Sequence, residues 1–110
     1  MGSSRLTVEQ IDLIADRFRA LAEPARLHIL NALRAGEHTV SELVEATELG
    51  TANVSKHLQL LFAAGFVTRR KQGFYVYYSL AGKDVFQLCD IMCGRLAQEA
   101  EKRQKVMSGR

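Results

Sequence analysis

The sequence lacks tryptophan and has one proline and two cysteines among 110 residues. It has no apolar run near the roughly 20 residues that a membrane-spanning helix needs. The first five residues, Met1 to Arg5, lack the apolar segment of a secretion signal. We therefore expect a cytoplasmic protein without membrane contact. Because export is not expected, the two cysteines indicate thiols rather than a structural disulfide.

The composition is that of an ordinary soluble globular protein, with 47% hydrophobic and 25% charged residues. The length predicts one domain over residues 1–110. A net charge of +3 is compatible with binding to nucleic acid but does not establish it. The sequence has no glycine-rich cofactor loop and no convincing nucleophile–base set, so we do not expect an enzyme.

Apolar residues at three- and four-residue steps predict five helices, over residues 8–22, 24–35, 39–46, 51–65 and 83–105. Thr39 with Glu42 has the spacing of a capping box at the start of the third helix. Alternating residues predict strands over 66–71 and 74–80, joined by a turn at Gln72-Gly73. The predicted class is mostly α with one β-hairpin, in the order ααααββα.

The third and fourth helices have the spacing of a helix-turn-helix, and the hairpin that follows would be its wing. The first and last helices carry apolar stripes outside this compact unit. A stripe without a partner in its own chain suggests packing on a second subunit, so these two helices are predicted to form a homodimer.

The fourth helix is predicted to enter the major groove of double-stranded DNA. Asn53 and Lys56 are assigned to base edges, because side chains near the start of a recognition helix reach them. Contacts to backbone or bases are assigned to Thr51, Ser55 and His57, and Gln59 also faces the groove. The alternative is a solvated helix face, with a neutral His57 bracing the neighbouring helix.

Three consecutive cations, Arg69, Arg70 and Lys71, are predicted to hold phosphates beside the wing. Gln72 is placed at the wing tip, reaching toward a minor groove. Strand alternation puts Arg69 and Lys71 on one face and Arg70 on the other, so the three cannot share one contact. Alternatively, these charges keep an edge strand soluble.

Cys89 and Cys93 lie four residues apart on the last predicted helix and so share one face. Their Cβ atoms would be roughly 5–6 Å apart, beyond the ~3.5–4.5 Å of a disulfide. The pair suits one soft ion, such as arsenite, zinc, cadmium or copper, with a third ligand from elsewhere. Redox sensing through bridges between subunits is a second interpretation, and two small buried hydrophobes a third.

The motifs together resemble the ArsR/SmtB family of winged-helix repressors. The resemblance rests on Phe18 to Leu30, which contains Leu-Ala-Glu-Pro-Ala-Arg-Leu-His-Ile-Leu, on Val54-Ser-Lys-His-Leu58, on Ala64-Gly-Phe-Val67 and on Tyr77-Tyr-Ser-Leu80. It implies a homodimer on an inverted-repeat operator, released by a metal ion, a metalloid or a thiol-reactive signal.

The chain departs from the family's patterns at several positions. Gly50-Thr51-Ala52 stands where many members have Ser-Gln-Ser, and Phe74 stands where the wing often has Arg. The third predicted helix lacks Cys-Val-Cys, and no histidine follows His57 to complete a zinc set on the last helix. The prediction is a DNA-binding repressor whose inducer is open. The alternative is a winged-helix protein-interaction module without specific DNA binding.

Overall fold

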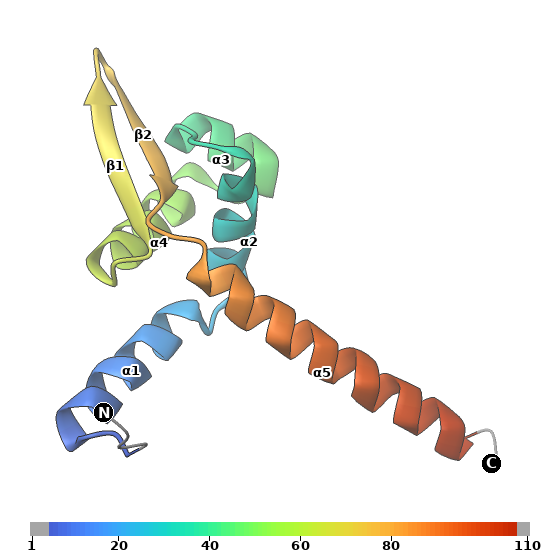
Figure 1. The fold of residues 1–110 in the computed structure, drawn as a ribbon. Coiled ribbons are helices and arrows are strands. Elements are labelled where there is room, and N and C mark those ends of the chain that lie inside the picture. The colour runs from blue at the N-terminus through green and yellow to red at the C-terminus, as the bar shows by residue number, and fades with distance from the viewer. Residues whose placement is uncertain (1–4, 108–110) are drawn as a thin grey trace.

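The structure is a computed structural model, and it describes residues 5–107. Figure 1 shows a small helical body from which a hairpin and two helices project. The predicted class and order, ααααββα, are confirmed. The elements are α1 (Val8–Leu21), α2 (Pro24–Ala32) with the 3-10 turn η1 (Leu33–Ala35), α3 (Val40–Thr47), α4 (Thr51–Ala63), β1 (Val67–Gln72), β2 (Tyr75–Leu80) and α5 (Asp84–Met107).

Local chemistry sets where the helices begin and end. The Thr39–Glu42 capping box is confirmed: the Glu42 amide donates to Thr39 Oγ1 at 3.2 Å, and the Thr39 amide donates to Glu42 Oε1 at 2.8 Å. Pro24 occupies the first turn of α2. The second predicted helix tightens into η1 before Gly36, whose φ of 134° favours glycine.

The core lies where α2, α3 and α4 meet. Its fully buried side chains come from these three helices: Ile29, Leu30, Leu43, Val54, Leu58 and Leu61. Val67 and Tyr78 of the hairpin join the same cluster, as do Val85 and Phe86 of α5. Burying each large aliphatic side chain contributes about 1.5–3 kcal/mol. This packing fixes α4 and the hairpin relative to each other.

The hairpin is an antiparallel pair whose register runs from Val67–Leu80 to Gln72–Tyr75. The turn is therefore Gly73-Phe74, one residue later than predicted. Gly73 takes a φ of 61°, which a two-residue hairpin loop requires and glycine tolerates. At the other edge, His38 pairs with Tyr78 through two backbone hydrogen bonds of 3.0 and 2.8 Å, which tie the hairpin to the loop before α3.

Helices α1 and α5 extend away from the core, in different directions (Figure 1). Both carry large exposed apolar side chains; on α1 these include Ile11, Leu13 and Phe18, and on α5 Leu88, Ile91, Met92 and Leu96. A single chain thus leaves two apolar helix faces uncovered. Within residues 5–107 no helix combines the length and hydropathy needed to cross a membrane.

Candidate nucleic-acid interface

The turn between α3 and α4 sets the direction of α4. Thr47 Oγ1 donates to the Leu43 carbonyl at 2.6 Å, and Glu48 takes a left-handed φ of 60° that ends α3. Gly50, the N-cap of α4, has no side chain to satisfy the first-turn amides. The N-terminus of α4 therefore presents free N–H groups to solvent, as helices that approach phosphates do.

The outward face of α4 is polar. The structure exposes Thr51, Asn53, Lys56 and Gln59, and half-buries Ser55. Asn53, Lys56 and Gln59 follow one another at three-residue steps, so they form one continuous stripe opposite the buried Val54 and Leu58. Such a stripe can present an amide and a cation to the base edges of a major groove.

His57 does not belong to this stripe. Its side chain is 8% exposed, and its Nδ1 is buried without a hydrogen-bond partner among the described residues. Burial favours the bracing role for His57, and its contact with DNA stays a prediction. The sequence contained the signal: His57 stands three residues after Val54 and four before Leu61, inside the apolar stripe.

The wing begins beside α4 and is locked to it. The Arg69 guanidinium lies over the Phe62 ring, 4.0 Å from its centroid, so β1 and the end of α4 are in direct contact. The register places Arg69 and Lys71 on one face of the hairpin and Arg70 on the other, as strand alternation predicts. Lys71 is exposed and forms no ion pair within residues 5–107.

Arg70 is engaged inside the chain. Its Nε donates to Glu37 Oε2 at 2.9 Å, its Nη2 donates to Glu37 Oε1, and its Nη1 donates to Gln72 Oε1 at 2.6 Å. The guanidinium also lies 4.8 Å from the centroid of the Tyr77 ring. Each of the three nitrogens has a protein partner, which uses three of the five N–H groups of Arg70 and holds the guanidinium toward Glu37. Sequence reasoning missed Glu37, which is 33 residues away and belongs to no motif.

The Glu37–Arg70 pair shifts the pKa of each group so that its charged form is favoured. The side-chain hydrogen bond from Arg70 holds the pKa of Glu37 below its ordinary value, and the same bond raises the pKa of Arg70. Both groups are in solvent, so the pair contributes little stability. Its consequence is conformational, because it directs Arg70 toward the loop before α3.

The predicted place of Gln72 is also corrected. Gln72 is the last residue of β1, paired with Tyr75, and its side-chain oxygen accepts from Arg70. Gly73 and Phe74 form the tip instead. The sequence could not separate the two turns, because a turn at Gln72-Gly73 and a turn at Gly73-Phe74 place the strand residues on the same faces of the hairpin.

The two cysteines line a groove of about 410 Å³ between α2 and α5. Cys89 is half-buried against the core, Cys93 is exposed, and both are free thiols. His28 of α2 and Asp90 also line this groove. No three histidine, cysteine or acidic side chains of residues 5–107 lie close enough to hold a metal ion. Residues 5–107 of one protomer therefore offer a pair of free thiols without a third metal ligand beside them.

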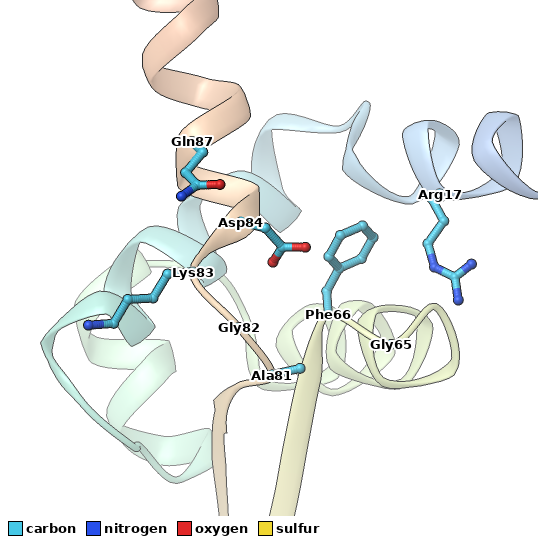
Figure 2. A pocket seen from close by; sticks show the side chains of 8 residues that line it. All are labelled: Arg17, Gly65, Phe66, Ala81, Gly82, Lys83, Asp84 and Gln87. Carbon is cyan, nitrogen blue, oxygen red and sulfur yellow. The ribbon is translucent and has the colours of Figure 1, made fainter. Parts of the chain in front are cut away.

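A second hollow, of about 570 Å³, lies between α1 and the start of α5. Figure 2 shows Arg17 entering from α1, Phe66 from the start of β1, and Asp84 and Gln87 from α5. None of the site residues predicted from the sequence lines it. It is therefore separate from the polar face of α4.

A buried helical core, a helix-turn-helix and a basic hairpin locked to the second helix define a winged helix-turn-helix protein. Comparison with known proteins identifies the family within this class. Residues 23–69 match the family described as "Bacterial regulatory protein, arsR family". The chain is also similar to Mb0332 of Mycobacterium bovis, a homodimeric winged helix-turn-helix DNA-binding domain that is described as a possible ArsR-family transcriptional regulator. The two sequences are 33% identical and the structures have a TM-score of 0.75, over 91% of this chain and 93% of that one. The chain belongs to the arsR family of bacterial regulatory proteins.

Curated relatives are similar over part of their length. The transcriptional repressor SmtB of Mycobacterium tuberculosis is 42% identical over 73 residues, which cover 66% of this chain and 54% of the relative. A protein of Streptomyces lividans described as "Probable mercury resistance operon repressor" is 39% identical over 77 residues, 70% of this chain and 62% of the relative. This chain thus spans between half and two thirds of these two relatives.

Proposed function

We propose that the protein is a homodimeric transcriptional repressor that binds an inverted-repeat operator in double-stranded DNA. One observation carries the proposal: the exposed Asn53–Lys56–Gln59 stripe of α4 lies next to a basic wing, which the Arg69–Phe62 contact holds against the same helix. Helix and wing are therefore presented together, as base-reading and phosphate-holding elements are. This function is binding, without a catalysed reaction, and we place it in the cytoplasm because a bacterial regulator acts on the chromosome.

The exposed apolar faces of α1 and α5 support the dimer. Phe18 on α1 is 54% exposed and Ile91 on α5 is 64% exposed. Contiguous apolar surface on this scale is typical of surfaces that bind a partner. The homodimeric relative Mb0332 also supports a second copy as that partner. We propose that residues 1–110 form one winged helix-turn-helix domain and that α1 and α5 build the dimer.

The test of DNA binding starts by selecting duplexes from a random library with the full chain. Fluorescence anisotropy on the enriched duplex then compares wild type with Asn53→Ala and Lys56→Ala. Each should weaken specific binding by about 1–3 kcal/mol and have a smaller effect on a scrambled duplex. Lys102→Ala removes the same charge at the far end of α5 and should leave the affinity unchanged.

Two results would contradict the proposal. If the selection enriches no sequence and binding is weak and insensitive to salt, the protein-interaction module takes its place, because an operator binder loses affinity steeply with salt. If Asn53→Ala and Lys56→Ala weaken specific and scrambled duplexes equally, these two residues do not read bases.

For the signal, we propose that Cys89 and Cys93 release the repressor from DNA when they react with a thiol-reactive agent or bind a soft ion. Their position supports this: the groove lies between α2, which belongs to the core, and α5, which is assigned to the dimer. Material added to Cys89 would push α5 away from α2. The effector would thus favour a dimer whose recognition helices are wrongly spaced for DNA.

The same anisotropy assay tests the signal. Arsenite, zinc or an organic polysulfide is added to reduced wild type and to a Cys89→Ser/Cys93→Ser variant. The variant should bind DNA like wild type and show no response to the agent that releases wild type. A response that persists in the variant would exclude these thiols. A response to a metal ion, but not to a polysulfide, would indicate that a second protomer supplies the missing ligand.

A further inference from the structure

Phe74 is a fully exposed aromatic side chain at the tip of the wing, with a relative exposure of 101%. The other aromatic residues of the hairpin are at least partly covered: Tyr78 is buried, Tyr77 lies beneath Arg70, and Tyr75 is 63% exposed. Water contacts the whole Phe74 ring, so nothing inside one protomer explains its position. A large apolar side chain at the end of this projecting, basic hairpin lies where a ligand of the wing would contact it.

The geometry of the hairpin makes Phe74 a narrow, projecting tip. The loop consists of two residues, Gly73 with a φ of 61° and then Phe74, which has no left-handed strain. Glycine at the first loop position is the arrangement of a tight hairpin turn. A six-residue strand is about 20 Å long, and Figure 1 shows the tip at the far end of the hairpin from the core.

The charge around the tip identifies the kind of partner. Residues 67–80 contain Arg69, Arg70 and Lys71 but no acidic residue. Lys71 precedes the tip by two positions and has no ion pair in the described part of the chain. An apolar tip that follows a run of cations fits a polyanion that also offers an apolar cleft. The Arg69–Phe62 contact joins the base of this wing to α4, the helix that carries the polar stripe.

We propose that Phe74 enters the minor groove of the DNA beside each half-site, as an apolar wedge. This inference rests on the proposed operator binding. The minor groove is about 6 Å wide and its walls are sugar rings, and apolar side chains are known to enter it and partly unstack a base step. Flexible pyrimidine–purine steps unstack most easily. Phe74 thereby selects flanking steps that α4 never touches.

The experiment separates an apolar contact from an ionic one. The dissociation constant on the enriched duplex is measured at several salt concentrations for wild type, Phe74→Ala, Phe74→Leu and Lys71→Ala. Phe74→Ala should weaken binding about 10-fold per copy, or about 100-fold in a dimer, without changing the salt slope, because no counterion is involved. Lys71→Ala should reduce the slope by about 2 in a dimer that carries two copies. Phe74→Leu should retain most of the affinity.

A second readout follows the bases themselves. A duplex with 2-aminopurine at the flanking step should fluoresce more strongly when wild type binds, and less strongly with Phe74→Ala. Circular dichroism and sedimentation check that the variant remains folded and dimeric, which full exposure of the side chain predicts.

Four outcomes overturn the inference. An unchanged affinity for Phe74→Ala removes the contact, and a slope change equal to that of Lys71→Ala shows a disturbed wing instead. If Phe74→Ala alters the sedimentation of the free protein but not DNA binding, the tip contacts a second copy. If wild type enriches no duplex, the proposed operator binding fails together with the inference. This result is distinguished from a failure of the inference alone, because it appears with wild type before any variant is compared.

Discussion

Replacing Glu37 by Gln should strengthen DNA binding, although Glu37 lies outside every DNA-binding motif. In the free chain Glu37 occupies two nitrogens of Arg70, and Gln72 accepts from the third. Phosphate must therefore compete with Glu37 for these two nitrogens. A neutral glutamine competes less well, because it lacks the negative charge that attracts the guanidinium to Glu37.

The structure gives the size of the effect. Within residues 5–107, the cations of α4 and the wing without a carboxylate partner are Lys56, Arg69 and Lys71, which makes about six in a dimer. At about −0.9 per phosphate contact, the logarithm of affinity should fall with the logarithm of salt with a slope of about −5. Releasing both copies of Arg70 adds two contacts and steepens the slope to about −7.

The assay is fluorescence anisotropy on the enriched duplex across a range of salt. Glu99→Gln on α5 is the matched control, since it removes the same charge far from the wing. Glu37→Gln should bind more tightly than this control at low salt, and the difference should shrink as salt rises. A slope equal to that of Glu99→Gln would refute the reasoning, because it would show that Arg70 already binds phosphate or never does.

Further predictions concern stability, measured by urea unfolding at one protomer concentration. Leu58→Ala removes a fully buried side chain and should cost about 3–5 kcal/mol; a loss below about 1 kcal/mol would contradict the assigned core. Thr39→Ala removes half of a capping box and should cost about 1 kcal/mol, while Thr39→Ser should cost little. His57→Leu should not lower stability, because it removes a buried nitrogen without a partner, and unchanged DNA affinity would confirm that His57 is not a contact. Since Arg70 lowers the pKa of Glu37 from 4.5, their pair should stabilise the fold fully above that value and progressively less as the pH falls through the lowered pKa; a wild-type advantage over Glu37→Gln that persists in strong acid would contradict this.

Much of the fold was predictable because each element carries its own local signal. The Thr39–Glu42 capping box and Pro24 in a first turn act within a few residues, and the apolar periods are equally local. The predicted boundary that was wrong is the hairpin turn, because two neighbouring turn positions fit the same alternation of residues. In the structure the loop is Gly73-Phe74, with glycine at its first position and Gln72 paired with Tyr75.

The candidate site was less accessible to sequence reasoning. A polar residue on a helix is readily assigned to a DNA contact, whereas His57 belongs to the buried stripe by its spacing from Val54 and Leu61. The partner of Arg70 could not be predicted, because the contact between residues 37 and 70 arises when His38 pairs with Tyr78. The groove that joins His28 to the cysteines likewise depends on how α5 leaves the core.

The way α5 leaves the core has a mechanical consequence. Val85 and Phe86, in its first turn, are its buried residues, and Arg34 lies over the Phe86 ring at 4.2 Å. The helix beyond Phe86 is an arm that continues to Met107, and at about 1.5 Å per residue it is about 32 Å long. A pivot of about 5° at Phe86 moves the far end by about 3 Å, close to the ~3.4 Å rise between neighbouring bases of one strand. Cys89 lies one turn from that pivot, where a small push produces the largest swing of the arm.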